Sequence, residues 1–259
     1  MKGNSYKEFV VYKGEKIEVN NGELHLPFHL ERFDEIEGLN QLTNLKKLHH
    51  EGFKLRKIEN LENLKNLESL TLLSSHHLTK IENLDSLTNL RVLDFTDSNI
   101  AEIGNLHNLR NLEILRLGKP YEMGENYITE IKGLENLSNL KELHLGHNQI
   151  KVIKGLDALT NLKILSLSYN QIKEVEGLHN LVNLEELYLV YNNINEINGL
   201  DNLTNLESLW LGNNKVTEIK GLENLSNLKE LQITDNGPFD SKSIGILEKM
   251  RENGIKVYF

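Results

Sequence analysis

Leucine and isoleucine recur at every third position over long stretches of this 259-residue chain. The clearest stretch carries aliphatic side chains at Ile150, Ile153, Leu156, Leu159 and Leu162. On an α-helix each step of three residues turns about 300°, so five such positions would spread around the whole cylinder. A backbone with three residues per turn keeps them on one line, which predicts short 3₁₀ turns or extended arcs.

The period changes from three to two just after this stretch. Leu165 and Leu167 alternate with Ile164, Ser166 and Ser168. Such alternation is typical of a β-strand with one buried and one exposed face. One unit of the chain is therefore predicted to be a short strand followed by an arc.

The unit of strand and arc is repeated along the chain. The dipeptide Asn-Leu marks the copies, and its asparagines are Asn44, Asn66, Asn89, Asn111, Asn139, Asn161, Asn183, Asn205 and Asn227. Neighbouring copies lie 22 residues apart, with one gap of 23 and one of 28. One unit cannot bury its leucines alone, so the units are expected to stack into a solenoid that shares one core.

A second asparagine follows each of the later strands at a fixed distance, at Asn148, Asn170, Asn192, Asn214 and Asn236. A polar side chain beside buried leucines is expected to bond backbone groups that a turn would otherwise leave without partners. The same reasoning applies to the asparagine before each arc leucine. Both columns are interpreted as parts of the scaffold.

The unit LTNLKILSLSYNQIKEVEGL resembles the leucine-rich repeat family, in particular its 22-residue subclass. That subclass includes the internalins and the leucine-rich regulatory subunit of a serine/threonine protein phosphatase. The resemblance runs from about Leu39 to Asn236. It implies an α/β solenoid, a curved right-handed horseshoe with a parallel β-sheet on its concave side and 3₁₀ or extended arcs on its convex side. It also implies binding, usually to another protein, without catalysis.

Residues 1–259 are expected to form a single domain with a cap at each end, because the terminal units of a solenoid need their apolar ends covered. Residues 1–32 are predicted to form an N-terminal β-cap. Nine repeats are expected over residues 33–237. Residues 238–259 are predicted to close the other end with a helix and a final strand.

The N-terminal cap is predicted from its turns and its apolar positions. Lys13-Gly14 and Asn21-Gly22 are typical of tight turns between short strands. The residues that follow are expected to begin the first rung of the solenoid. Leu26 and Phe28 are assigned to its two leucine positions.

The gap of 28 residues contains an insertion of six residues between Leu117 and Ile128. The insertion, within 118–126, follows a strand and is therefore expected on the rim of the concave face. It is either a tolerated surface loop or a loop whose Tyr121 and Met123 contact a ligand.

Aromatic side chains gather in two columns of the predicted concave face. Equivalent positions of neighbouring rungs lie about 4.8 Å apart in a parallel sheet. The middle outward position places Tyr188 beside Trp210, and a position three residues further along places Tyr169 beside Tyr191. Tyrosine and tryptophan are enriched in binding hot spots, so these columns predict a partner-binding patch. The alternative is cross-strand packing without a ligand.

Three polar residues are assigned to the same surface. His144 and His147 occupy the two columns in an earlier repeat, and Glu186 begins the strand that carries Tyr188. The ten histidines show no clear ligand spacing, so neither a metal nor another cofactor is expected.

The composition and charge of the chain exclude several classes of function. The formal net charge of −9 disfavours nucleic acid and anionic membranes as partners, because both bind basic surfaces. The chain has no cysteine, which excludes thiol nucleophiles, and it has no recognisable catalytic or phosphate-binding motif. The N-terminal segment lacks the apolar run of a secretory signal, so a cytoplasmic location is expected.

We therefore expect a non-enzymatic protein–protein interaction module that binds a partner through its concave face. The alternative, implied by the family resemblance alone, is a regulatory subunit of a serine/threonine protein phosphatase or a similar enzyme.

Overall fold

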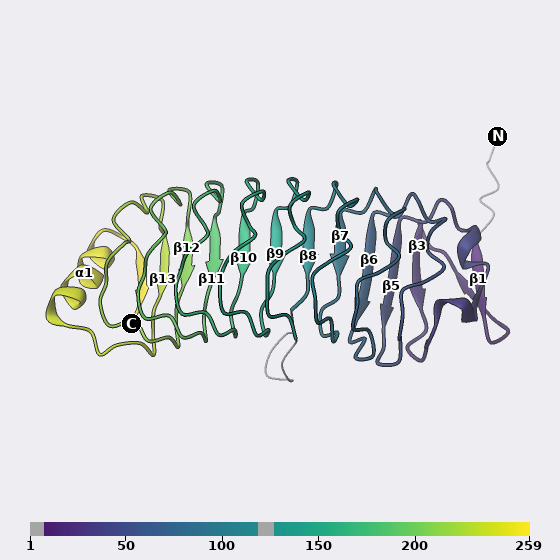
Figure 1. Cartoon of the computed structure of the whole chain (residues 1–259), viewed down its shortest axis with the longest axis horizontal. Helices are drawn as coiled ribbons and strands as arrows, with labels where there is room; N and C mark the ends of the chain where they lie inside the picture. Colours follow the sequence, from purple (N-terminus) through teal and green to yellow (C-terminus); the bar gives the residue numbers. More distant parts are fainter. Residues whose placement is uncertain (1–7, 119–126) are drawn as a thin grey trace.

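Eleven short strands lie side by side in one parallel sheet that runs the length of the molecule (Figure 1). This count refers to residues 8–118 and 127–259, which the computed structural model describes. In chain order the strands are β3 (Glu23–Leu26), β5 (Lys47–Glu51), β6 (Ser69–Leu73), β7 (Val92–Asp94), β8 (Ile114–Arg116), β9 (Glu142–His144), β10 (Ile164–Ser166), β11 (Glu186–Tyr188), β12 (Ser208–Trp210), β13 (Glu230–Gln232) and β14 (Lys256–Tyr258).

Equivalent positions of neighbouring repeats pair along this sheet. Leu165 of β10 pairs with Leu143 of β9 on one side and with Leu187 of β11 on the other. All three leucines are fully buried. They belong to one continuous hydrophobic core that extends from Val10 to Val257, so each rung completes its core by contact with its neighbours.

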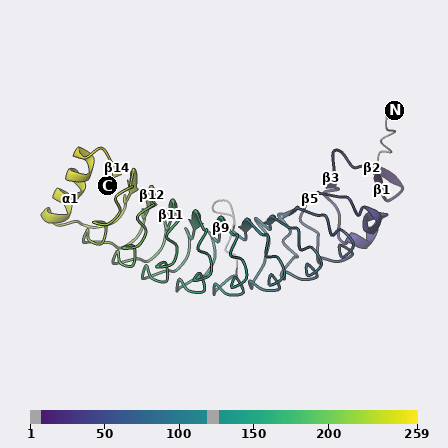
Figure 2. The ribbon, with the colours of Figure 1, turned by 90° about the horizontal axis from the view of Figure 1, so that it is seen from above.

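The arcs on the other side of the core are series of turns. The N–H of Leu159 donates to the carbonyl of Leu156, and the N–H of Leu162 donates to that of Leu159, both at 2.9 Å. Hydrogen bonds that span three residues are those of 3₁₀ structure, which confirms the predicted period. In the described ranges, 3₁₀ helices are assigned only in the first arc, as η1 (Phe33–Glu35) and η2 (Leu39–Gln41). Figure 2 shows the strands on the concave side and the turns on the convex side.

Both asparagine columns bind the backbone as predicted. Asn170 donates from Nδ2 to the carbonyl of Leu145 (3.0 Å), and its Oδ1 accepts from the N–H of Ile150 (2.9 Å). Asn161, in the other column, donates to the carbonyl of Ser138 (2.9 Å). Each amide side chain thus joins consecutive rungs, which is a structural role.

A second, antiparallel sheet covers the N-terminal end, with β1 (Phe9–Tyr12) between β2 (Glu15–Glu18) and β4 (Ile36–Glu37). The predicted turn between β1 and β2 is present, and Lys13 and Gly14 have φ values of 51° and 83°.

The structure corrects the expected leucine positions of the first rung. Leu24 pairs with Leu48 and Leu26 pairs with His50, whereas Phe28 is 46% exposed. The first rung therefore begins two residues earlier than predicted. The reason is the turn before it, where the carbonyl of Gly22 accepts backbone N–H groups of the next rung at 2.8 and 3.0 Å and fixes the start of β3.

Helix α1 (Ser241–Glu252) and strand β14 close the C-terminal end. The side chain of Asp240 accepts the N–H of Ser243 at 2.7 Å and caps the helix. Leu247 is fully buried against the last rung, whereas Ile244 of the same helix is 38% exposed. No helix within the described ranges is long and apolar enough to cross a membrane.

Candidate functional site

Tyr188 and Trp210 lie side by side on the concave surface. They are register partners on β11 and β12, and their ring centroids are 5.7 Å apart with the planes inclined by 51°. Both side chains are half-buried. They point outward because the strand alternates and the preceding leucines, Leu187 and Leu209, are fully buried. The predicted pair is therefore present in the structure.

Glu186 holds the hydroxyl of Tyr188. The phenol donates a hydrogen bond to the carboxylate of Glu186, two residues earlier on the same face of β11. Burial, and then this carboxylate, raise the pKa of Tyr188 to about 12. At neutral pH the phenol is protonated, so it remains a donor and orients the carboxylate beside the two rings.

A second row of rings lies where the chain leaves the strands. The ring of Tyr169 stacks on His147, with centroids 4.0 Å apart and planes inclined by 12°. It also stacks on Tyr191, at 4.4 Å and 18°. Tyr191 is 45% exposed. We call His147, Tyr169 and Tyr191 the rim stack.

The residues of the rim stack have a left-handed backbone. The φ values of His147, Tyr169 and Tyr191 are 56°, 56° and 55°. Bulky side chains rarely adopt this conformation, whereas asparagine and aspartate adopt it more readily. The same position in the next two repeats holds Asn213 and Asp235, with φ values of 54° and 55°. The backbone would therefore suit a smaller polar side chain better than a tyrosine.

His144 belongs to a separate, charged cluster. The guanidinium of Arg116 contacts the carboxylate of Glu142 at 2.8 Å, and Nε2 of His144 lies 3.4 Å from the same carboxylate. Burial, followed by the charge of Arg116, lowers the pKa of His144 below its ordinary value. On the sheet Ser166 lies between His144 and Tyr188, so the concave face does not bring His144 and the ring pair into direct contact.

Two of the predicted contact residues, Tyr121 and Met123, lie outside the described residues. Their contact with a ligand stays a prediction.

A further set of rings was not predicted from the sequence. Phe53 contacts Phe28 and His76 through ring centroids 5.2 and 5.1 Å apart, and Phe28 and Phe53 are 46% and 47% exposed. The sequence does carry a sign of these rings. In the first repeat, Phe53 takes the position of the asparagine that follows each of the later strands. The contact between Phe53 and Phe28 was not predicted, because Phe28 was assigned to a buried leucine position of the first rung.

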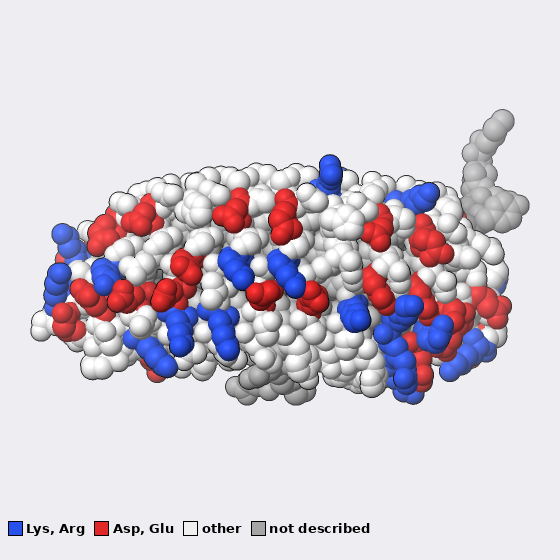
Figure 3. All heavy atoms as spheres, viewed as in Figure 1, with Lys and Arg blue, Asp and Glu red and all other residues white. Residues whose placement is uncertain are grey.

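The convex face has a different chemistry. Acidic and basic side chains alternate along it (Figure 3). Many are paired across neighbouring repeats, as Lys154 is with Glu130 (3.0 Å) and Lys132 is with Glu102 (2.6 Å). Exposed pairs of this kind contribute little to stability but make the surface polar.

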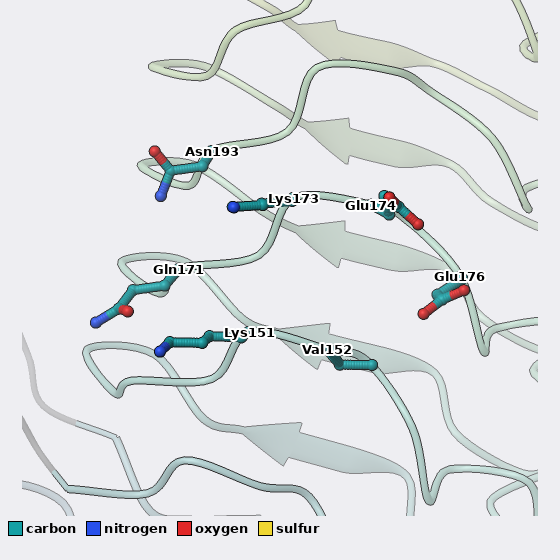
Figure 4. Close-up of a pocket in the computed structure, with 7 residues that line it drawn as sticks. All are labelled: Lys151, Val152, Gln171, Lys173, Glu174, Glu176 and Asn193. Atoms are coloured by element: carbon teal, nitrogen blue, oxygen red, sulfur yellow. The ribbon is translucent and has the colours of Figure 1, made fainter.

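A hollow of about 520 Å³ lies between neighbouring loops of this face (Figure 4). Its lining is Lys151, Val152, Gln171, Lys173, Glu174, Glu176 and Asn193. A similar hollow lies between the loops of an earlier pair of repeats, next to Lys80 and Glu102. The spacing of the loops accounts for both, so we assign neither to a ligand. No group of three or more histidine, aspartate or glutamate side chains in the described part of the chain could hold a metal ion.

The chain is similar to known proteins over much of its length. A family model described as leucine-rich repeats (2 copies) matches residues 138–178, 160–204 and 204–244. The crystal structure of internalin C2 from Listeria monocytogenes shares 31% identity, with a TM-score of 0.62, over 70% of this chain and 76% of that chain. A comparison of the sequence with curated protein sequences gave no match.

Two other solved structures have the same fold. An internalin, inlF, from Listeria monocytogenes is 25% identical with a TM-score of 0.62, over 92% of this chain and 80% of that chain. TLR13, in a complex with ssRNA13, is 27% identical with a TM-score of 0.67, over 82% of this chain but only 32% of that chain.

Proposed function

The chain belongs to the leucine-rich repeat family, and we propose that it binds a partner protein through the concave surface around Tyr188, Trp210 and the rim stack. The fold supports a protein-interaction module in general, because a curved sheet presents many outward side chains to one partner. The proposal assigns no catalytic step to the chain.

The observation that carries this proposal is the left-handed backbone of Tyr169 and Tyr191. The conformation belongs to the scaffold, because Asp97, Asn213 and Asp235 adopt it at the same position, but a tyrosine there costs roughly 1 kcal/mol or more. Stacking between the rings offsets part of that cost. The scaffold does not require tyrosine, since Asn213 has the same conformation in the next repeat. Binding gives a reason for the exposed rings.

A protein suits this surface better than nucleic acid or an anionic membrane does. The net charge of the chain is −9, and Glu186 lies beside the ring pair. An acidic surface repels phosphate groups. No contact described above favours a phosphatase over another protein, so the regulatory-subunit hypothesis stays a prediction, as does the cytoplasmic location.

Affinity capture from an extract of the native cell tests the proposal. The full chain and its Tyr188→Ser/Trp210→Ser variant would be immobilised side by side, and bound proteins identified by mass spectrometry. The variant should fold, because Ser166 already occupies the same outward position. We expect one dominant protein on the unmodified chain and its loss from the variant. Equal capture by both would contradict a concave binding site, and a phosphatase catalytic subunit would favour the regulatory hypothesis.

A further inference from the structure

We propose that the concave surface beside Trp210 binds an arginine side chain of the partner protein, between the carboxylates of Glu186 and Glu230. This inference rests on the proposed function and specifies the chemistry of the ligand at that site.

The two carboxylates flank the tryptophan on the same face of the sheet. Glu186 on β11 and Glu230 on β13 are both register partners of Ser208 on β12, and Trp210 is the next outward residue of β12. Two strand spacings separate the two glutamates, or about 9.6 Å at the backbone. Ser208 is small, so it leaves space between the carboxylates, in front of the indole ring.

Neither of these carboxylates forms an ion pair in the described part of the chain, although Lys256 of β14 is the register partner of Glu230. In the described ranges, neither Glu186 nor Glu230 has a basic group within 4.0 Å. The carboxylates nearby are neutralised by contrast: Glu142 pairs with Arg116 at 2.8 Å, Glu185 with Lys163 at 2.6 Å and Glu207 with Lys229 at 2.7 Å. Glu186 has only Ile164 and Ser208 as register partners, so the surface beside Trp210 carries negative charge that no ion pair of the described residues neutralises.

No cation of the described residues lies over the indole ring. The only ring contact of Trp210 among the described residues is with Tyr188, and the three cation–π contacts found there involve Tyr12, Phe9 and Phe259. Gln232, the register partner of Trp210, directs its amide towards Gly212, and its Oε1 accepts the N–H of Gly212 at 2.8 Å. Tryptophan is the aromatic side chain that binds cations best.

Arginine fits this arrangement better than lysine. A guanidinium is planar, stacks on an aromatic face and directs its donors sideways in a rigid fork. One guanidinium above Ser208 can therefore bond carboxylates on both sides while it lies against Trp210. The ammonium of lysine is compact and strongly hydrated, and it cannot stack. The hydroxyl of Tyr188 already occupies one oxygen of Glu186, which leaves the other oxygen for the ligand.

The fluorescence of Trp210 reports this site directly, because it is the only tryptophan of the chain. The full chain would be titrated with a short synthetic peptide centred on Leu-Arg-Leu, with the same peptide carrying citrulline, and with the same peptide carrying lysine. Citrulline keeps the shape of arginine without its charge. We expect a saturable change in emission with the arginine peptide, binding at least tenfold weaker with citrulline, and an intermediate affinity with lysine.

Two charge variants complete the experiment. Glu186→Gln/Glu230→Gln should reduce the affinity for the arginine peptide to that of the citrulline peptide, and the glutamine amide can still accept the hydroxyl of Tyr188. The matched control is Glu174→Gln/Glu176→Gln, which makes the same change in net charge on the convex loops (Figure 4). The control should bind the arginine peptide normally.

The inference is overturned if the arginine peptide does not bind at millimolar concentrations, if arginine and citrulline bind equally, or if the control variant weakens binding as much as the concave one. These outcomes are separable from failure of the proposed function. If Tyr188→Ser/Trp210→Ser loses the natural partner and Glu186→Gln/Glu230→Gln keeps it, concave binding stands and the arginine site is wrong.

Discussion

At the residue scale, His50 shows most clearly how this chain departs from its own repeat. Its imidazole is fully buried between its register partners Leu26 and Leu72; the backbone of Leu26 and Pro27 lies near the ring, but neither ring nitrogen makes a hydrogen bond of good geometry within the described residues. Burial, and then the neighbouring His49, lower the pKa of His50 to about 4. An unsatisfied polar group in a leucine position destabilises the fold.

Replacing His50 by leucine should therefore stabilise the protein. We expect His50→Leu to raise the free energy of unfolding at pH 7 by about 1–3 kcal/mol, because it removes the desolvation cost of the imidazole and keeps the core filled. Urea denaturation followed by circular dichroism measures this difference. A less stable variant would show that the imidazole has a favourable partner in solution.

The burial of His50 also predicts that the stability of the protein depends on pH. The folded-state pKa of about 4 lies below the ordinary value of 6.5, so the unfolded chain binds the proton more readily. Above pH 6.5 this group does not make stability depend on pH, and as the pH falls from 6.5 towards 4 the free energy of unfolding decreases by about 3 kcal/mol, because the unfolded chain takes up a proton that the folded chain does not. His50→Leu should lack this loss, so the stability difference between the two proteins should widen on acidification. If the free energies of unfolding of the two proteins differed by the same amount at pH 7 and at pH 4, the lowered pKa of His50 would be contradicted.

The left-handed position of Tyr191 gives a third prediction. Asparagine tolerates this backbone and alanine does not, so Tyr191→Asn should be more stable than Tyr191→Ala by about 0.5–1 kcal/mol. Both variants lose the stacking contact with Tyr169, so their difference isolates the backbone effect. Thermal unfolding of the two proteins compares them. Equal melting temperatures would show that the chain relaxes away from the left-handed conformation.

At the element scale, the repeat predicted the strands and arcs because burial follows a strict spacing. Leu165 and Leu167 are buried and Ser166 faces out, as the alternation indicated. The first rung was assigned incorrectly because β3 has no complete repeat before it, so only the turn at Gly22 fixes its register. The stacking of Tyr169 on Tyr191 could be predicted, because the two residues occupy the same position of neighbouring repeats. The left-handed backbone of Tyr169 could not, because it depends on the geometry of the turn and not on the spacing of residues.

The capping helix gives a prediction with an internal control. Leu247 of α1 is fully buried against the last rung, whereas Ile244 is 38% exposed. Leu247→Ala should lower the free energy of unfolding by about 2–4 kcal/mol, because it leaves a cavity under the helix. Ile244→Ala should cost less than about 1 kcal/mol. Chemical denaturation measures the free energy of unfolding of both variants. A larger loss for Ile244→Ala than for Leu247→Ala would mean that the helix packs through its other face.

At the scale of the whole molecule, the two faces of the solenoid differ in a way that favours concave binding. The convex face carries ion pairs that join neighbouring repeats, such as Lys154 with Glu130. The concave face near the C-terminal end carries the ring pair, the rim stack and two carboxylates, Glu186 and Glu230, that form no ion pair among the described residues. A protein partner that covers this surface would bury aromatic side chains, which dominate the energy of many interfaces.

The most direct measurement of this claim is the affinity of the purified partner for two double variants, obtained by isothermal titration calorimetry. Tyr188→Ser/Trp210→Ser should bind at least about thirtyfold more weakly, because loss of hot-spot aromatic groups costs about 2 kcal/mol or more. Lys154→Ser/Lys220→Ser, on the convex arcs, should bind within about twofold of the unmodified chain. The account is contradicted if the folded concave variant binds normally, or if the convex variant is the one that loses affinity.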